Sequence, residues 1–229
     1  MKEFFVIGNQ TSSSLSPLIF NHWFKKYKIK ARYSYVEVDD IGFDTAVAKK
    51  LENKNTTGFN VTIPYKKRIF KHLKTKNVHA TQIGAVNCVL VGANTKGINT
   101  DWIGYMGSIK NTKIKKSGKI LILGFGGAAQ AIFYGFSKKK YKNIIVFNRS
   151  RKAIKKSGAN RFTKKYSLID KHLKEADLII NTTPTNPLKR KQTKLIRTST
   201  IISDIVYKPK ETAFLKNFKE NKDSCFYKL

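Results

Sequence analysis

The amino-acid sequence predicts an α/β fold of two domains. Short apolar runs alternate along the chain with stretches of helical periodicity, which is typical of strands covered by helices. The length of 229 residues and the apolar fraction of 41% suit one large or two small domains. The pattern changes after a basic, aperiodic stretch at residues 113–118. We therefore predict a first α/β domain over residues 1–103 and a second over residues 104–229.

In the first domain, strands and helices are predicted to alternate before a hairpin. Ser16 is predicted to be the N-cap of the first helix and Pro17 its first helical residue. This helix carries a broad apolar stripe of Leu18, Ile19, Phe20, Trp23, Phe24 and Tyr27. The hairpin turns at residues 92–95. Strands are predicted at 4–8, 32–38, 58–62, 84–91 and 96–99, and further helices at 43–51 and 66–73.

In the second domain, continuous apolar strands indicate a parallel sheet with both faces covered. Strands are predicted at 119–123, 143–147, 176–181 and 201–206, with a helix at 128–137. Residues 120–136 carry no charge and reach the lower limit of about 17 residues for a membrane span. Because this stretch contains four glycines and a glutamine, we interpret it as strand, turn and helix. We expect no membrane segment and no signal peptide.

Composition limits the possible functions. Cys88 and Cys225 are far apart and form no CxxC pattern, so we expect no disulfide framework, and a reducing cytoplasm fits. The four histidines show no metal-ligand spacing, so we expect no metal. The net charge of +32 attracts polyanions and small anions. Because the lysines are spread along the whole chain, we expect no specific nucleic-acid partner. The sequence leaves the oligomeric state open.

A glycine-rich loop at residues 124–128 predicts a nucleotide site. It lies between a predicted strand and a predicted helix, where glycines let the backbone approach a pyrophosphate at the helix N-terminus. Gly124 and Gly126 keep the first spacing of the GxGxxG fingerprint, and Ala129 takes the place of the third glycine. The alternative is an ordinary strand-to-helix turn that needs glycine.

The end of the next strand favours NADP over NAD. NAD sites usually place Asp or Glu there to bind the ribose hydroxyl. Here the strand is followed by Asn148, Arg149 and Ser150, and an arginine with a hydroxyl suits a 2′-phosphate. The alternative is that the cations of residues 149–152 are solvated surface charges.

Two segments supply a candidate proton-transfer pair. Lys66 follows a turn closed by Pro64, beside Asn60 and Thr62, and Asp101 ends the segment Asn99-Thr100-Asp101. Asp101 is one of only 14 acidic residues, so its place carries more information than that of a lysine among 46 Lys and Arg. A lysine and a carboxylate brought together can donate and accept a proton.

Eight motifs, in order along the chain, resemble those of the shikimate dehydrogenase family. They are Gly8-Asn9 with Ser14-Leu15-Ser16-Pro17, Asn60-Val61-Thr62-Ile63-Pro64-Tyr65-Lys66, Gly84-Ala85-Val86-Asn87, Asn99-Thr100-Asp101, the Gly124 loop, Asn148-Arg149-Ser150, Asn181-Thr182-Thr183-Pro184 and Asp204-Ile205-Val206-Tyr207. The resemblance implies an N-terminal substrate domain, a C-terminal Rossmann NADP domain and an active site between them. The implied reaction is the reversible NADPH-dependent reduction of 3-dehydroshikimate to shikimate.

The resemblance also implies roles for individual residues. Lys66 and Asp101 are the implied catalytic pair. The implied substrate ligands are Ser14, Ser16, Asn60, Thr62, Asn87 and Tyr207. The implied cofactor contacts are Gly124, Gly126, Gly127, Ala128, Asn148, Arg149, Ser150, Thr182 and Ile205. Without the family, Ser16 could be only a helix cap, and Asn60 and Thr62 only turn residues.

The chain departs from the family pattern at three places. Cys88 stands where Thr or Ser is usual, and Trp102 follows Asp101 where a small residue is usual. Residues 217–229 lack the Gly-Met-Leu segment and the helix with a substrate-binding Gln that the family implies. A natural short form, a truncated chain and a partner chain remain open as explanations. The alternatives to the dehydrogenase are a non-catalytic relative that binds a nucleotide or another anion, and a quinate dehydrogenase.

Overall fold

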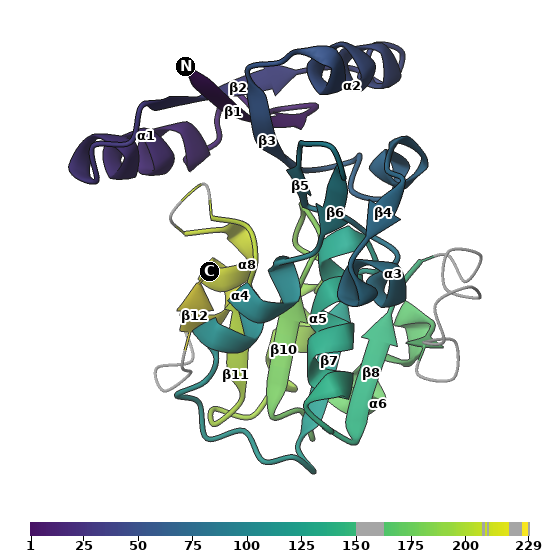
Figure 1. Ribbon diagram of the computed structural model, residues 1–229. Helices are drawn as coiled ribbons and strands as arrows, with labels where there is room; N and C mark the ends of the chain where they lie inside the picture. Colours follow the sequence, from purple (N-terminus) through teal and green to yellow (C-terminus); the bar gives the residue numbers. More distant parts are fainter. Residues whose placement is uncertain (150–162, 208, 210, 220–225, 229) are drawn as a thin grey trace. The chain divides into compact units, whose positions relative to one another are not determined.

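The computed structural model describes residues 1–149, 163–207, 209, 211–219 and 226–228 (Figure 1). The chain forms two compact units, Met1–Thr100 and Asp101–Leu229. The division falls just before the predicted end of the first domain at residue 103. It does so because α4 (Asp101–Ser108) packs against α5 (Gly127–Lys138) of the second unit.

The first unit contains a six-stranded mixed sheet in the order β2-β1-β3-β5-β6-β4. The first three strands in this order are parallel, whereas β5 is antiparallel to both β3 and β6. The strands are β1 (Lys2–Gly8), β2 (Ala31–Glu37), β3 (Thr56–Val61), β4 (Thr75–Lys76), β5 (Cys88–Leu90) and β6 (Lys96–Ile98). The five predicted strands are confirmed. β5 starts at Cys88 and not at the predicted residue 84; Gly84, at φ 73°, is instead the C-cap of the helix α3 (Val78–Ile83).

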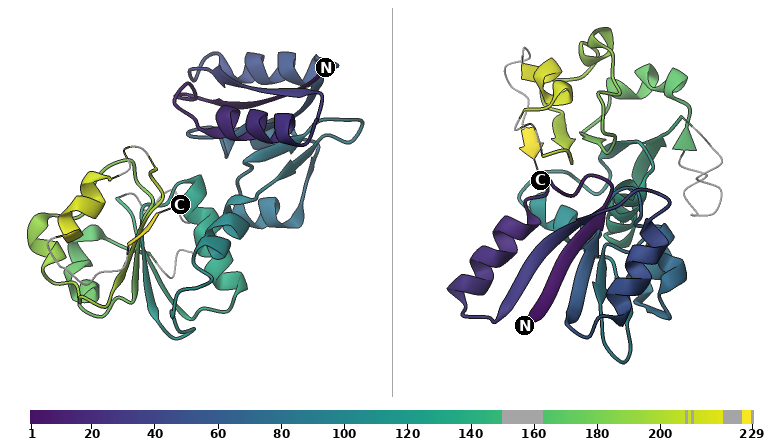
Figure 2. Two further views of the ribbon diagram at one scale, coloured as in Figure 1. Left: turned by 90° about the vertical axis from the view of Figure 1, so that its left-hand side faces the viewer. Right: turned by 90° about the horizontal axis from the view of Figure 1, so that it is seen from above.

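Helices α1 (Ser16–Lys26) and α2 (Phe43–Glu52) lie on opposite faces of this sheet (Figure 2). The connections β1-α1-β2 and β2-α2-β3 run in opposite directions across the sheet, so right-handed crossovers place their helices on opposite faces. Alternate residues of β1 therefore face different helices. Phe5 and Ile7 pack in one cluster with Phe43 of α2, and Phe4 meets Phe24 of α1.

Two helix predictions in this unit are wrong. Leu15, and not Ser16, is the N-cap of α1, because the Leu15 carbonyl accepts the first helical hydrogen bond, from the Ile19 amide at 3.0 Å. Ser16 is the first helical residue, and its amide donates to Ser14 Oγ at 3.2 Å. The predicted helix at 66–73 is the shorter 3₁₀ helix η1 (Arg68–His72). The apolar stripe of α1 is only partly covered, since Leu18, Ile19, Trp23 and Tyr27 are exposed.

The second unit contains a six-stranded, all-parallel sheet in the order β12-β11-β10-β7-β8-β9. Its strands are β7 (Lys119–Leu123), β8 (Asn143–Phe147), β9 (Thr163–Lys164), β10 (Leu178–Asn181), β11 (Ile201–Asp204) and β12 (Phe226–Lys228). The four predicted strands of this domain are confirmed, and so is the predicted helix as α5. The shorter helices η3 (Tyr166–Leu168), α6 (Asp170–Leu173), α7 (Arg190–Thr193) and α8 (Ala213–Lys219) were not predicted.

Alternate residues of the central strands fill two cores, one on each face of this sheet. Ile120 and Ile122 of β7 pack with residues of α4 and α5, whereas Leu121 and Leu123 pack with residues of α6 and α8. Both faces are thus covered, which explains why the strands are continuous apolar runs. Within the described residues, no helix has the length and apolar character needed to cross a membrane.

Candidate active site

Four predicted cofactor residues line the carboxyl edge of the parallel sheet. Leu123, Phe147, Asn181 and Asp204 align across β7, β8, β10 and β11. The residues that follow them are Gly124, Asn148, Thr182 and Ile205. The strand order reverses between β7 and β10, and ligands of open parallel sheets bind beside such a point (Figure 1).

Gly124 has to be glycine for two reasons. Its φ is +100°, which side chains rarely tolerate, and a Cβ there would lie 2.7 Å from Thr182 Oγ1. Thr182 in turn donates its hydroxyl to the carbonyl of Leu123 at 2.6 Å. The loop that leaves β7 is therefore packed directly against the loop that leaves β10.

The N-terminus of α5 is suited to a phosphate. Gly126 is the N-cap, and no described side chain caps the helix there. A Cβ on Gly126 would meet nothing within 4 Å, so the space beside it is open. The first turn contains Gly127, Ala128 and Ala129 and no acidic residue, so its amide groups and helix dipole favour an anion. The loop thus fits the pyrophosphate of a dinucleotide.

Arg149 and an unpredicted tyrosine lie at the same edge. Asn148 is half-buried and Arg149 is exposed, while Ser150 lies outside the described residues. Burial raises the pKa of the Tyr166 hydroxyl to about 12, opposed by the nearby charge of Arg149 and a hydrogen bond with the backbone of Gly124. Its ring contacts Phe147. Sequence analysis missed Tyr166 because it lies in a stretch without clear periodicity.

In the first unit, hydrogen bonds connect two of the predicted substrate ligands. Asn60, near the end of β3, donates from Nδ2 to the carbonyl of Asn87 at 3.1 Å. Asn87 Nδ2 donates to Thr100 Oγ1 at 2.9 Å, and the Thr100 amide donates back to Asn87 Oδ1 at 2.8 Å. Because β5 is antiparallel to β3, the start of β5 brings Asn87 beside the end of β3. Thr100 was not predicted as part of this set.

Thr62 is held against the end of β1. Its amide donates to the carbonyl of Ile7 at 3.0 Å, and the Asn9 amide donates to the carbonyl of Ile63 at 3.2 Å. A Cβ on Gly8 would lie 2.4 Å from Thr62 Cγ2. The Gly8-Asn9 motif is therefore needed for this close approach.

The backbone of Lys66 is anchored on both sides. Its carbonyl accepts from the Val86 amide at 2.8 Å, next to Asn87. The preceding Tyr65 is buried, stacks on Phe43 and donates its hydroxyl to the carbonyl of Val38 at 3.1 Å. The turn that carries Lys66 is thus fixed to the same edge of the sheet as Asn60 and Asn87.

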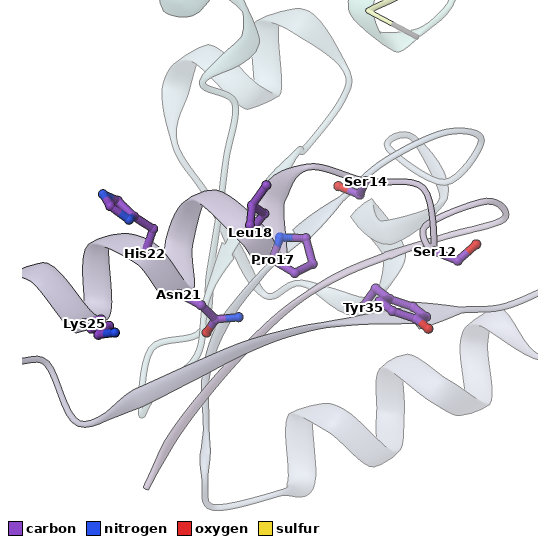
Figure 3. A pocket seen from close by; sticks show the side chains of 8 residues that line it. All are labelled: Ser12, Ser14, Pro17, Leu18, Asn21, His22, Lys25 and Tyr35. Carbon is purple, nitrogen blue, oxygen red and sulfur yellow. The ribbon is translucent and has the colours of Figure 1, made fainter. Parts of the chain in front are cut away.

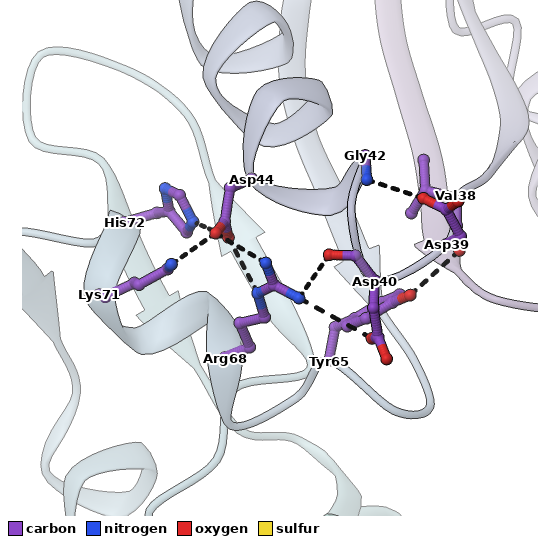
Figure 4. Close-up of polar contacts among 9 residues, drawn as sticks. All are labelled: Val38, Asp39, Asp40, Gly42, Asp44, Tyr65, Arg68, Lys71 and His72. Carbon is purple, nitrogen blue, oxygen red and sulfur yellow. Dashed lines mark hydrogen bonds and ion pairs between the residues drawn. The ribbon is translucent and has the colours of Figure 1, made fainter.

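A charge cluster fixes the helix after Lys66. Arg68 donates to both carboxylate oxygens of Asp44 in α2, at 3.1 and 2.8 Å, and Lys71 and His72 contact the same carboxylate (Figure 4). Hydrogen bonds from Arg68, and then from Lys71 and His72, hold the pKa of Asp44 well below its usual range. The cluster joins η1 to α2.

The remaining predictions for catalysis concern residues of different units. Lys66 belongs to the first unit, whereas Asp101 is the first residue of α4 and Tyr207 follows β11 in the second. The pairing of Lys66 with Asp101 and the substrate contact of Tyr207 stay predictions. Trp102, the departure beside Asp101, is buried and meets Tyr134 of α5 edge-on, at 5.5 Å between ring centroids.

A pocket also lies between α1 and β2, but it contains only one predicted ligand. Figure 3 shows it lined by Ser12, Ser14, Pro17, Leu18, Asn21, His22, Lys25 and Tyr35. Asn60 and Asn87 are not among these residues. In the described part of the chain, no three His, Cys, Asp or Glu side chains are grouped so that they could hold a metal ion.

The parallel sheet, its glycine turn and the open helix N-terminus define a dinucleotide-binding α/β protein with an additional α/β unit. The family model described as shikimate dehydrogenase substrate binding domain matches residues 6–89, and that described as shikimate / quinate 5-dehydrogenase matches residues 108–207. The chain belongs to the shikimate dehydrogenase family, as its sequence motifs indicated.

Individual relatives agree with this assignment. The chain is 34% identical to the shikimate dehydrogenase (NADP(+)) of Clostridium botulinum over 94% of its length and 86% of the relative's. It is 36% identical to the corresponding protein of Staphylococcus epidermidis, over 93% of this chain and 81% of that protein.

Solved structures of the family share the fold. The shikimate dehydrogenase of Aquifex aeolicus superposes with a TM-score of 0.87 at 32% identity, covering 100% of this chain and 86% of that one. The Thermus thermophilus enzyme in complex with NADP(H) and shikimate gives a TM-score of 0.84 at 26% identity, covering 99% and 86%.

Proposed function

We propose that this protein is an NADP-dependent shikimate dehydrogenase, an oxidoreductase that reversibly reduces 3-dehydroshikimate to shikimate. This reaction is a step in the biosynthesis of chorismate and the aromatic amino acids. The observation that carries the proposal is the match of both units to the family, together with a phosphate-suited loop in the second unit and a connected set of polar side chains in the first. We also propose a cytoplasmic location, because Cys88 and Cys225 lie far apart in the sequence and form no CxxC pattern.

The polar side chains of the first unit suit a polyhydroxylated carboxylic acid. Asn60, Thr62 and Asn87 offer amide and hydroxyl groups for ring hydroxyls, and Ser14 and Ser16 are proposed to bind the carboxylate. NADPH, when bound, supplies the hydride to the ring carbonyl. Lys66 is proposed to stabilise the developing alkoxide and donate its proton, while Asp101 positions the substrate and the lysine.

The cofactor contacts are proposed at the carboxyl edge of the parallel sheet. Gly124, Gly126, Gly127 and Ala128 would bind the pyrophosphate, and Asn148, Arg149 and Ser150 the adenosine phosphate. Thr182 and Ile205, at the ends of β10 and β11, would face the nicotinamide half. Arg149 supports NADP over NAD, because a guanidinium pairs well with a phosphate.

The test follows NADPH formation from shikimate and NADP⁺ in the wild type and in Lys66→Ala. We expect turnover in the wild type and a loss of at least about a thousandfold in the variant, in line with a group that acts in proton transfer and charge stabilisation. Lys74→Ala, which removes an exposed lysine of the same segment, is the matched control and should retain activity.

Three other outcomes separate the alternatives. A wild type that binds NADP⁺ but does not turn over shikimate would favour the non-catalytic relative. Faster turnover of quinate with NAD⁺ would favour a quinate dehydrogenase. Binding of nucleic acid with a steep salt dependence would indicate that the net charge serves to bind nucleic acid.

A further inference from the structure

The hydroxyl of Tyr33 lies between two of the proposed substrate ligands. It is 2.7 Å from Asn60 Oδ1, and the side chain of Ser16 lies close enough to lower its pKa, against the larger effect of burial. The tyrosine is only 3% exposed. Sequence analysis singled out Ser16 and Asn60 but gave no role to Tyr33, which lies on β2 between them in the chain.

The hydrogen bonds fix which way the Asn60 amide points. The carbonyl of Asn87 can only accept, so the Asn60 atom 3.1 Å from it must be Nδ2. Asn60 Oδ1 therefore faces Tyr33, whose single hydroxyl proton is donated to it. The nearby Ser16 hydroxyl can then approach the Tyr33 oxygen only as a donor, the direction that lowers the Tyr33 pKa. The second N–H of Asn60 has no partner among the described residues and remains available to a ligand.

Tyr33 is itself held rigidly. Its ring stacks on Phe20 of α1, with 4.6 Å between centroids and 7° between planes. Asn21 of the same helix binds both backbone groups of Tyr33, accepting from its amide at 2.9 Å and donating to its carbonyl at 2.8 Å. Because two bonds and a ring contact fix the edge strand to α1, the position of the hydroxyl is determined by the fold.

We propose that Tyr33 is a positioning residue for substrate binding, which holds the Asn60 amide with one N–H directed to a substrate hydroxyl and keeps Ser16 aligned. The proposal rests on the proposed function, since it assumes that Asn60 and Ser16 bind the substrate. Burial raises the pKa of Tyr33 far above neutrality, so the hydroxyl keeps the proton that Asn60 requires. Free rotation of the Asn60 amide would remove this preorganisation.

The kinetic test compares Tyr33→Phe with the wild type in the full chain. The variant keeps the ring that stacks on Phe20 and removes only the hydroxyl. We expect KM for shikimate to rise about tenfold, the effect of a lost hydrogen bond, with KM for NADP⁺ unchanged. In an Asn60→Ala background the same change should add little, because both substitutions remove one interaction. Tyr27→Phe, at an exposed tyrosine just after α1, is the matched control.

A second test does not depend on turnover. The side-chain amide protons of Asn60, observed by ¹⁵N NMR, should exchange slowly in the wild type and faster in Tyr33→Phe. An unchanged Asn60 signal in the variant would overturn the proposal, as would an unchanged KM for shikimate in an active enzyme. If the signal depends on Tyr33 but the wild type does not turn over shikimate, the positioning role stands and the proposed function fails.

Discussion

At the scale of single residues, glycines mark the places where two segments of the chain touch. Gly8 lies against Thr62, and Gly124 lies against Thr182. In both pairs, each partner belongs to one of the motifs by which the sequence resembles the family. These residues therefore have a structural reason to be present, the contact between the ends of neighbouring strands, that is separate from their proposed ligand contacts.

Gly124→Ala is predicted to weaken NADP⁺ binding by at least about tenfold. The alanine would have to adopt the positive φ of Gly124, a strain that costs about 1–3 kcal/mol. Its Cβ would also collide with Thr182, and relief of the collision would move the phosphate loop. Calorimetric titration with NADP⁺ and a thermal melt measure both effects. Gly92→Ala is the control, because a Cβ there meets nothing within 4 Å. Wild-type affinity in Gly124→Ala would contradict the assignment of this loop.

Candidate site residues in short local motifs could be predicted from the sequence, whereas residues that act through long-range contacts could not. Asn60, Asn87 and Gly124 belong to short local patterns, so they could be found from the sequence. Tyr33 and Thr100 act through bonds to residues 27 and 13 positions away, which depend on strand pairing. Tyr33 lies in none of the motifs, and Thr100 lies in one, but neither local sequence indicates the bonding partner.

At the scale of elements, strands were easier to predict than helix ends. Continuous apolar runs such as 119–123 and 143–147 are determined by burial on both faces, so β7 and β8 match their predicted bounds. The start of α1 depends instead on which carbonyl accepts the first helical hydrogen bond, here that of Leu15, and the Ser16-Pro17 pattern does not determine this. The short elements η1, α6 and α7 are set by tertiary contacts and have little periodicity of their own.

The contact between η1 and α2 is predicted to make stability depend on pH through Asp44. Because its folded-state pKa is depressed, Asp44 stabilises the fold above its unfolded pKa of about 4, and this contribution is lost as the pH falls through the folded value. Asp44→Asn should therefore lower Tm near neutral pH, and the difference should shrink in acid. Melts of both proteins across this range measure it, with Glu52→Gln, an exposed acid at the end of α2, as the control.

A constant Tm difference between wild type and Asp44→Asn at all pH values would contradict this account. Added salt should reduce the difference at neutral pH, because the ion pairs are partly exposed and are screened.

At the scale of the whole molecule, the net charge of +32 is predicted to raise the rate at which anionic substrates bind. Both proposed substrates are anions, so a positive potential raises their association rates, and salt should reduce that effect. We predict that kcat/KM for NADP⁺ falls severalfold between about 0.05 and 0.5 M salt, where the Debye length drops from more than 10 Å to less than 5 Å. Steady-state kinetics at each salt concentration measure kcat/KM, and stopped-flow binding measures the association rate. Flat profiles would show that the charge has no steering role.

The general architecture was predictable because it depends on repeated patterns. The two α/β units and the parallel sheet follow from many apolar runs, and an error in one run does not change the result. The predicted hairpin implied that β5 and β6 are antiparallel. The antiparallel pairing of β5 with β3 was less obvious from the sequence.

That antiparallel hairpin has a practical consequence for engineering. The turn at residues 92–95 connects β5 to β6, at the opposite end of these strands from Asn87 and Asn99. Gly92 has open space beside its Cα, and Ala93 and Asn94 are exposed. A fluorescent reporter or affinity handle inserted there would label the protein at a distance from Asn87, one of the proposed substrate ligands.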